Sequence, residues 1–416
     1  MRFLINGGKR LEGKIKTSGS KNSVLKLIPA SLLADSPVTL TNVPQIRDVD
    51  VMIELAEKLG VKVFRNRDQL TIDPSGLKSY ILDPLSSAKV RASVVFAAPL
   101  LARFGKAVIT LPGGDSIGER ALDTHFSMLR EFGVEITQNA NKFNLEWKSK
   151  KTPDIFLEEA SVTATEMALI LGAVSAGKVK VEDAACEPHV KDLAFFLEKM
   201  GAKISGAGHN IVEIEGKQKL TGVTHRVIPD HIDGATFAIA AAITGGKVEM
   251  TDFVYEDYRM ILRYLENMGV LYQVNQNSLT ILPSKLVAKK RKFQTRPWPG
   301  FPTDLMSPFI VLATQTEGTV LCHDWMYEWR IFFVDDLISM GANILIADPH
   351  RVVVTGKSKL RGDTLHCKDI RAGISIILAA LVAEGQSVIR HIEIVERGYE
   401  NVYERFKALG ADIKVQ

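Results

Sequence analysis

The chain has 416 residues, of which 46% are hydrophobic and 24% are charged, a composition typical of folded globular proteins. At roughly 150 residues per domain, this length predicts two or three domains. The formal net charge of +4 is too small to predict binding to nucleic acid or to a membrane, although it permits a local basic site for an acidic ligand.

Cysteine usage and hydropathy indicate the compartment. Cys186, Cys322 and Cys367 are odd in number, far apart and without a CxxC pair, which favours reduced thiols over disulfides or zinc ligands. Residues 1–8 hold too short an apolar patch for a signal peptide, and the longest apolar run, near residues 374–383, is shorter than the ~20 residues that span a bilayer. We therefore expect a cytoplasmic protein.

A helix-like segment that ends in glycine and passes into a short strand occurs six times. The copies are about 70 residues apart, a spacing typical of repeated supersecondary units, and a glycine directly after a helix predicts a left-handed C-cap. The segments are 55–63, 129–136, 197–204, 265–272, 337–344 and 406–413, with Gly60, Gly133, Gly201, Gly269, Gly341 and Gly410.

A second series alternates with the first. Each copy is a helix of small residues, a break and a β-rich run, so each repeat is predicted as helix–strand–helix–strand–turn–strand. This alternation predicts an α/β fold with βαβ connections. In the first repeat, Met52, Leu55 and Leu59 have the helical spacing that places one apolar face on a sheet. The copies are 32–43, 100–111, 171–181, 240–250, 311–321 and 379–389.

The sixth repeat lacks its last strand, because the chain ends at Gln416 where a hairpin partner should follow. Residues 3–13 match residues 211–222 and 352–362, which hold that partner in other repeats. We therefore predict that the N-terminal strand completes the last repeat and that the termini lie close together. The repeats also divide the chain into two globules, residues 21–229 and residues 1–20 plus 230–416.

Charged and polar residues recur where the helices of the repeats are expected to begin. Helix N-termini attract anions, so two globules that face each other with such ends predict an anion-attracting cleft. At the first helices stand Lys21, Asn22, Arg91, Ser161–Thr163, Asp230, Asp233, Asp304 and Arg371, and at the second helices Asp48, Asp50, Asp115, Arg120, Glu187, Glu256, Glu328, Arg330 and Arg397.

The sign of the charge separates these residues. Asp48, Asp50 and Asp233 are interpreted as N-caps, for which aspartate is a preferred residue. Lysine and arginine at a helix start oppose the helix dipole and stabilise nothing locally. The cations therefore predict a phosphate or carboxylate ligand, with ordinary surface charge as the alternative. They are Lys21, Arg91, Arg330, Arg371 and Arg397.

Residues 111–120, LPGGDSIGER, follow a predicted buried strand at 107–111. Their glycines permit backbone conformations closed to other residues. One interpretation is a turn in which Ser116 and Glu119 form a capping box for the next helix. The other is a functional loop that carries Asp115 and Arg120.

The motifs of several common enzyme classes are missing. The sequence has no Walker GxxxxGK[ST], no HExxH and no GxSxG with a matching triad. Its nine histidines show no metal-ligand spacing, so His125, His189 and His231 are interpreted as structural residues or peripheral ligand contacts. The residues therefore predict an acidic small-molecule substrate, with no metal and no cofactor.

Four motifs resemble those of the enolpyruvyl transferases: SGSKN at 18–22, LPGGxxIGxR at 111–120, GFPTD at 300–304 and RGYE at 397–400. The similarity runs end to end and implies an inside-out α/β barrel in each globule, with closure around substrates. It implies transfer of the enolpyruvyl group from phosphoenolpyruvate to the 3-hydroxyl of UDP-N-acetylglucosamine, through a tetrahedral intermediate with release of phosphate. This is the first committed step of peptidoglycan precursor synthesis, and it implies no nucleic-acid, membrane or obligate protein partner.

The resemblance also implies residue roles. Asp304 would accept the proton of the sugar hydroxyl, and Asp115 would act as general acid toward the methylene carbon, while clustered cations, with Lys21 and Arg397 among the catalytic residues, stabilise charge. Phosphoenolpyruvate would be bound by Lys21, Asn22, Arg91, Arg120, Arg330, Arg371 and Arg397. The UDP-sugar would be bound by Asn22, Arg91, Arg120, Ala121, Leu122, Asp123, Thr124, Ser161, Val162, Thr163, Asp304 and Met326.

Asp115 stands where most family members carry cysteine. A carboxylic acid cannot be alkylated as a thiolate, so we expect insensitivity to the epoxide fosfomycin. A catalytic acid also needs a raised pKa, which Arg120 opposes. Two alternatives are open, another hydroxyl acceptor such as shikimate 3-phosphate and a catalytically silent UDP-sugar-binding protein. Four further departures concern the affinity for the nucleotide and the identity of the activated sugar. They are Ala121 for proline, Glu159 for lysine, Thr163 for glycine and Trp329 for asparagine.

Overall fold

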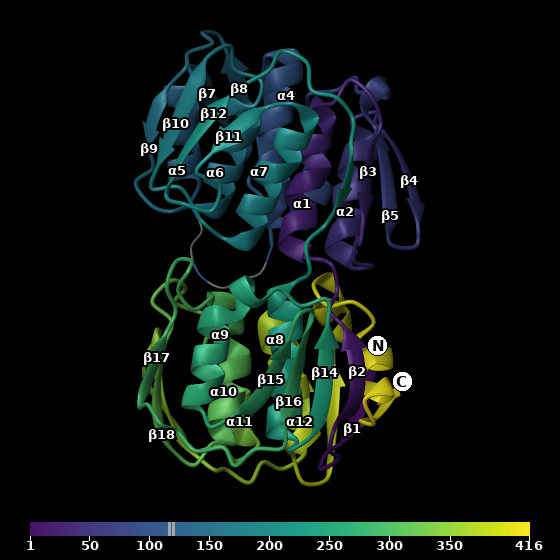
Figure 1. The fold of residues 1–416 in the computed structure, drawn as a ribbon, viewed down its shortest axis with the longest axis vertical. Coiled ribbons are helices and arrows are strands. Elements are labelled where there is room, and N and C mark those ends of the chain that lie inside the picture. Colours follow the sequence, from purple (N-terminus) through teal and green to yellow (C-terminus); the bar gives the residue numbers. More distant parts are fainter. Residues whose placement is uncertain (115–117, 119–120) are drawn as a thin grey trace. The chain divides into compact units, whose positions relative to one another are not determined.

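The computed structural model describes residues 1–114, 118 and 121–416, which form two compact units (Figure 1). The chain passes from one unit to the other after Ser18 and after Ile228, whereas the repeats place these boundaries after residues 20 and 229. The first unit contains residues 19–114 and 121–228, and the second unit contains residues 1–18 and 229–416.

Each unit is built from three copies of a helix–strand–helix–strand–strand repeat, as the two alternating series predict. In the first unit the copies are α1 (Lys21–Ala30), β3 (Val38–Thr41), α2 (Arg47–Lys58), β4 (Lys62–Asn66) and β5 (Gln69–Asp73); α4 (Ala97–Phe104), β6 (Lys106–Thr110), α5 (Asp123–Glu131), β7 (Val134–Asn139) and β8 (Lys142–Trp147); and α6 (Val162–Gly172), β10 (Lys178–Glu182), α7 (Pro188–Met200), β11 (Lys203–Ser205) and β12 (Ile211–Glu215).

In the second unit the copies are α8 (His231–Ile243), β14 (Lys247–Thr251), α9 (Tyr255–Asn267), β15 (Leu271–Asn275) and β16 (Ser278–Leu282); α10 (Met306–Thr314), β18 (Gly318–His323), α11 (Val334–Ser339), β19 (Ile344–Asp348) and β20 (Arg351–Gly356); and α12 (Ile370–Val382), β22 (Gln386–Arg390), α13 (Val402–Ala408) and β23 (Asp412–Val415). The other elements are β1 (Arg2–Asn6), β2 (Glu12–Lys16), β9 (Asp154–Phe156), β13 (Thr224–Arg226), β17 (Lys292–Gln294), β21 (Thr364–His366), α3 (Pro84–Ser87), and the 3-10 helices η1 (Ser31–Leu33), η2 (Pro74–Gly76), η3 (Arg91–Phe96), η4 (Thr303–Leu305) and η5 (Ile392–Arg397).

Each repeat contributes one sheet; among the described residues five sheets have four strands in equivalent order, and the sheet of the second repeat, β6-β8-β7, has three. In the first repeat the order is β13-β3-β5-β4, in which β5 is antiparallel to both β3 and β4. The strands β3 and β4 therefore run in the same direction and are joined through α2, which is the predicted βαβ connection.

The N-terminal strand completes the last sheet. Strand β1 lies between β22 and β23 and is antiparallel to both. The N–H of Arg2 donates to the carbonyl of Gln416 at 2.9 Å, and the N–H of Gln416 donates back at 3.0 Å. The two ends of the chain lie side by side (Figure 1). The prediction that the N-terminal strand closes the sixth repeat is confirmed.

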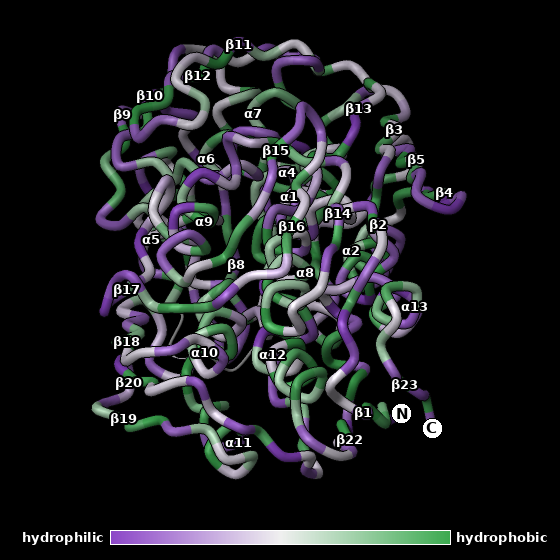
Figure 2. The backbone as a smooth tube through the Cα atoms, turned by 60° about the horizontal axis from the view of Figure 1, so that its bottom comes forward, coloured by the Kyte–Doolittle hydropathy of each residue, from purple (hydrophilic) through white to green (hydrophobic). Residues whose placement is uncertain are grey.

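The first helix of each repeat lies inside its unit. The helices α8, α10 and α12 are buried along almost their whole length and are largely hydrophobic (Figure 2). They pack on one another, with β17 and β18 on one side and β1 and β2 on the other (Figure 1). Burial alternates along strands such as β14, because successive side chains point to opposite faces. This is the predicted inside-out α/β barrel.

The six signature glycines follow the second helices with φ between +82° and +121°, which confirms the predicted left-handed turns. In the first repeat, the N–H of Val61 donates to the carbonyl of Ala56 at 3.1 Å, the long bond of a Schellman motif. On the same helix Met52, Leu55 and Leu59 are fully buried. The apolar face predicted from their spacing is confirmed.

Candidate active site

Four of the predicted site and loop residues lie outside the part of the chain that the structure describes: Asp115, Ser116, Glu119 and Arg120. The acid role of Asp115, the anion-binding role of Arg120 and the capping box of Ser116 and Glu119 stay predictions. The start of the loop is described. A Cβ on Gly113 would lie 1.7 Å from the backbone oxygen of Ala88, so glycine is required where the loop leaves β6.

In the second unit, the structure brings three predicted site residues into contact. Asp304 lies in η4, immediately before α10, and accepts hydrogen bonds from Nη2 of Arg330 at 3.1 Å and Nη2 of Arg371 at 2.6 Å. The two arginine side chains are only 4% and 5% exposed, whereas the Asp304 side chain is 24% exposed. The carboxylate is therefore held by two buried guanidinium groups and remains accessible.

Both guanidinium groups stay charged. Burial opposes the charged form of Arg371, but the Asp304 carboxylate, with Tyr399 and Asp230, raises its pKa above the usual value. The pKa of Arg330 is also raised against the effect of burial, by Asp304, Asp369 and Asp324. Pairs of arginines bind carboxylate and phosphate groups through fixed forks of donors. The cluster formed by Asp304, Arg330 and Arg371 is called the Asp304 cluster below.

His231, interpreted from the sequence as a structural residue or a peripheral ligand contact, lies close to the Asp304 cluster. This residue begins α8, and its ring packs against Trp298 with centroids 5.4 Å apart. Burial lowers the pKa of its imidazole to about 4; Asp304 opposes this shift and Arg371 adds to it. His231 is therefore a neutral group within the field of the Asp304 cluster, and its Nδ1 is buried with no hydrogen-bond partner among the described residues.

In the first unit, the SGSKN motif forms the start of α1. Ser20 accepts a hydrogen bond from the N–H of Ser23 and caps the helix, and Lys21 and Asn22 are its first two residues. Nζ of Lys21 lies 2.8 Å from Oδ2 of Asp48 at the start of α2. Both side chains are largely buried, so this ion pair is a defined feature of the unit.

The structure also brings together the segments expected to line the UDP site. Nη2 of Arg91 donates to the carbonyl of Ala121 at 3.2 Å, next to Leu122 and Asp123, where α5 begins. Oγ1 of Thr124 donates to Glu159 at 3.1 Å, and Thr163, which follows Ser161 and Val162, lies 2.6 Å from Nε2 of His125. The starts of η3, α5 and α6 therefore meet within the first unit.

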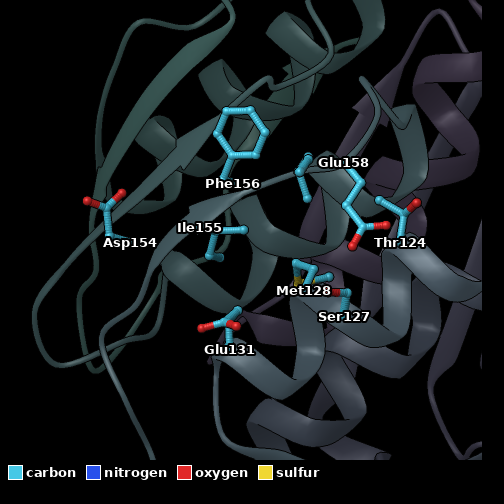
Figure 3. A pocket seen from close by; sticks show the side chains of 9 residues that line it. Thr124, Ser127, Met128, Glu131, Asp154, Ile155, Phe156 and Glu158 are labelled. Carbon is cyan, nitrogen blue, oxygen red and sulfur yellow. The ribbon is translucent and has the colours of Figure 1, made fainter.

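A cavity of about 220 Å³ lies beside this region (Figure 3). It is lined by side chains of α5, of β9 and of the segment after β9, including Thr124, Met128 and Phe156. Glu131, Asp154 and Glu158 also line it. This acidic lining disfavours phosphate groups in the cavity, because like charges repel.

The N-cap interpretation of Asp48, Asp50 and Asp233 is wrong. The residue that caps α2 is Ile46, and the side chain that caps α8 is Asp230. The three carboxylates bind cations instead, because each lies within reach of a long basic side chain from another segment. Asp48 pairs with Lys21, Asp50 with Arg65 at 2.6 Å, and Asp233 with Arg405 at 2.6 Å.

The argument from the helix dipole applies to three of the five cations, because Arg330 and Arg397 lie in the segments that enter α11 and α13 and not in the helices themselves. Lys21, Arg91 and Arg371 do lie in first helical turns. Arg330 lies in a turn before α11, and Arg397 is the last residue of η5. Lys21 and Arg371 also have protein carboxylates as partners, so the statement that they stabilise nothing locally is wrong.

Two further results concern the described chain. Met326 lies two residues after the buried Asp324. The N–H of Met326 donates to Oδ1 of Asp324 at 3.0 Å. Within residues 1–114 and 121–416, no group of three or more His, Cys, Asp or Glu side chains is arranged to hold a metal ion. No helix in the same ranges is long and apolar enough to cross a membrane.

Comparison with known proteins identifies the family. The chain matches the EPSP synthase (3-phosphoshikimate 1-carboxyvinyltransferase) family over residues 5–406. It is 44% identical to the UDP-N-acetylglucosamine 1-carboxyvinyltransferase of Treponema denticola, with 100% of this chain and 99% of the relative covered. The chain belongs to the enolpyruvyl transferases. The enzyme of the same name from Bradyrhizobium diazoefficiens is 43% identical, with 100% and 98% covered.

Solved structures of enolpyruvyl transferases share the fold. The enolpyruvyl transferase NikO from Streptomyces tendae superposes with a TM-score of 0.89 at 24% identity, over 99% of this chain and 98% of that one. EPSP synthase from Acinetobacter baumannii superposes with a TM-score of 0.75 at 19% identity, over both whole chains. At these identities the similarity concerns the fold alone, and it confirms the predicted architecture.

Proposed function

We propose that this enolpyruvyl transferase transfers the 1-carboxyvinyl group of phosphoenolpyruvate to the 3-hydroxyl of UDP-N-acetylglucosamine and releases phosphate. The observation that carries the proposal is the Asp304 cluster, in which an accessible carboxylate lies between two buried guanidinium groups. The names of the relatives at 43% and 44% identity support the choice of acceptor.

The proposed chemistry begins at Asp304. Its carboxylate takes the proton of the sugar hydroxyl while the oxygen forms a bond to C2 of the enolpyruvyl group, and Asp115 donates a proton to C3. In the tetrahedral intermediate, the Asp115 carboxylate takes a proton back from C3 and the C2–C3 double bond re-forms, while the C2–O bond to phosphate breaks and phosphate leaves with the electron pair. Anionic substrate groups compete with the Asp304 carboxylate for the guanidinium groups of Arg330 and Arg371.

The proposal assigns binding roles to the remaining residues. Arg330, Arg371 and Arg397 bind the carboxylate and phosphate of phosphoenolpyruvate and offset negative charge in the intermediate. Lys21 and Arg397 belong to the catalytic set. Further phosphoenolpyruvate contacts come from Lys21, Asn22, Arg91 and Arg120. The UDP-sugar contacts come from Asn22, Arg91, Arg120, Ala121–Thr124, Ser161–Thr163, Asp304 and Met326.

The proposal includes a cytoplasmic location, which the three unpaired cysteines Cys186, Cys322 and Cys367 support. Disulfides are rare in that compartment.

A phosphate-release assay tests the function. Purified protein is incubated with phosphoenolpyruvate and either UDP-N-acetylglucosamine or shikimate 3-phosphate. Release with the UDP-sugar supports the proposal. Release with shikimate 3-phosphate alone would instead establish 3-phosphoshikimate 1-carboxyvinyltransferase activity. Binding of the UDP-sugar without release would instead establish a silent binding protein.

A further inference from the structure

The first turn of α1 is tied to α7 through a buried serine. Ser23 is the third residue of the helix and is fully buried. Its N–H donates to Oγ of the capping Ser20 at 3.3 Å, and its own hydroxyl donates to Oδ2 of Asp192. One residue therefore connects the cap of α1 with a charged group on a neighbouring helix.

The Asp192 carboxylate is held from the other side as well. Its Oδ1 accepts a hydrogen bond from Nε2 of His225, on β13, at 2.9 Å. Nδ1 of His225 lies 3.3 Å from Nζ of Lys199. A lysine ammonium can only donate, so the neutral imidazole with its proton on Nε2 satisfies both contacts. Ser23, Asp192, His225 and Lys199 thus form a continuous hydrogen-bonded row.

A second buried group holds the same turn. Nζ of Lys26 donates to the carbonyl of Asn22 at 2.9 Å and lies 3.3 Å from Oε1 of Glu166 on α6. The side chains of Lys26 and Glu166 are 6% and 0% exposed. The turn that carries Lys21 and Asn22 is therefore connected to α7 through Ser23 and to α6 through Lys26.

At the other end of α1, the described residues show no such arrangement. Ser31 follows the last residue of the helix, is also fully buried, and donates only to the carbonyl of Leu27 at 2.7 Å. Burying charged groups costs free energy that packing with apolar residues of similar volume would avoid. The buried ionisable groups around the first turn, Asp192, Lys26 and Glu166, are thus more than packing requires.

We propose that Ser23, Asp192 and Lys26 are positioning residues that hold the first turn of α1 in one rotation and one axial position, so that Lys21 and Asn22 meet the substrates in a defined place. The inference rests on the proposed function of Lys21 and Asn22. Small displacements of groups that contact a substrate lower the rate by up to ~100-fold. Loss of one of these two connections permits such a displacement while the helix itself remains.

Steady-state kinetics on Ser23→Ala tests the proposal. We expect kcat/KM for phosphoenolpyruvate to fall by about 10- to 100-fold, whereas Ser23→Thr, which keeps the hydroxyl, should retain most of the wild-type value. Ser31→Ala is the matched control, because it removes an equally buried hydroxyl from the opposite end of the same helix. It should leave kcat/KM unchanged, and its melting temperature should fall less than that of Ser23→Ala, because the lost hydrogen bond is to a neutral carbonyl.

Equal kinetics for Ser23→Ala and Ser31→Ala would overturn the proposal, as would failure of Ser23→Thr to retain activity while it stays folded. Should Ser23→Ala not fold, Lys26→Met replaces it, since Lys26 holds the turn independently. The same loss of kcat/KM is expected from this variant, and wild-type kinetics in it would overturn the proposal.

A readout without substrate separates this proposal from the function. Reductive ¹³C-methylation reports lysine ammonium groups by NMR, and the Lys21 signal is assigned by its loss in Lys21→Arg. We expect Ser23→Ala to shift or broaden this signal and Ser31→Ala to leave it unchanged. If the wild-type protein releases no phosphate but the signal responds as expected, the function fails and the positioning role stands. An unchanged signal in Ser23→Ala overturns the positioning role.

Discussion

The two units follow the same three-repeat plan but place their buried ionisable groups differently. In the second unit, Arg330 and Arg371 converge on Asp304, whose carboxylate remains accessible. In the first unit, Asp192 and Glu166 are enclosed between helices and point to buried partners. A charge at the open end of a barrel can meet a ligand, whereas a charge enclosed among the helices can only hold them. The same fold thus leaves a paired carboxylate accessible in the second unit and encloses Asp192 and Glu166 in the first.

The difference extends to the response to pH. Burial lowers the pKa of His231 in the second unit to about 4. In the first unit, burial raises the pKa of Glu166 to about 7; Lys26 opposes this shift and the charge of Glu187 adds to it. Both shifts favour the neutral form, because burial penalises charge. The two groups therefore change stability in opposite directions as pH rises.

The largest effect is expected at the accessible carboxylate. Asp304→Asn removes the proposed base and should lower kcat by ~10²- to 10⁴-fold, the usual contribution of a general base. Phosphate release under saturating substrates measures it. Asp50→Asn, which removes a more exposed ion pair with Arg65, is the control and should leave kcat unchanged. A loss of less than 10-fold in Asp304→Asn would contradict the role of base.

Glu166 should destabilise the first unit as pH rises. Its folded pKa of about 7 exceeds that of an unfolded glutamate, near 4.5, so the unfolded chain loses its proton first. The free energy of unfolding should therefore fall by about 3 kcal/mol between pH 4.5 and 7, at ~1.4 kcal/mol per pKa unit. Urea unfolding of wild-type protein and Glu166→Gln measures this fall, which the variant should lack.

The exposed Glu135, paired with Lys148, supplies the control for that experiment. Glu135→Gln should keep the wild-type pH dependence. An identical dependence in Glu166→Gln and the wild-type protein would show that Glu166 ionises normally, and the contrast between the units would disappear.

His231 should act in the opposite direction. Its folded pKa of about 4 lies below that of an unfolded histidine, near 6.5, so the unfolded chain binds a proton first as pH falls. The free energy of unfolding should therefore rise by about 3 kcal/mol between pH 4 and 6.5. Melting temperatures across this range, compared between wild-type protein and His231→Asn, measure the rise. The control variant His209→Asn changes an exposed histidine and should show the same rise as the wild-type protein.

The smallest effect is expected from thiol alkylation. Burial raises the pKa of Cys186 to about 11 and that of Cys367 to about 12, and it raises the pKa of Cys322 well above its usual value. These thiols stay protonated and unreactive at neutral pH, and position 115 carries a carboxylic acid. Incubation with fosfomycin should therefore cause no time-dependent loss of activity. Progressive inactivation with label on Asp115 or on any of the cysteines would contradict this expectation.

Local features of the fold could be predicted because they depend on neighbours in sequence. The positive φ of Gly60 follows from its place after a helix, and the burial of Met52 follows from helical spacing. The pairing of β1 with β22 and β23 could also be predicted, because an incomplete repeat leaves one strand position to fill. Here the repeat itself indicated which strands, far apart in the sequence, pair in one sheet.

The partners of individual charges could not be predicted in the same way. Asp48 and Asp233 were expected to cap helices, yet they bind Lys21 and Arg405. Glu166 lies within a helix with no polar pattern to distinguish it, although it is one of the most deeply buried carboxylates. An ion pair between distant segments depends on distance and burial, which spacing along the chain does not contain.

The sequence by itself determined the repeat, its six glycine turns, the closure by the N-terminal strand and the residue types that suit an anionic substrate, because each depends on local conformation or on repetition. Tertiary structure alone decided which carboxylate meets which cation, that Asp304 remains accessible between Arg330 and Arg371, and that His231 and Glu166 are buried. Those properties arise from packing side chains of distant segments in a medium of low polarity, where solvation and charge together set the protonation state.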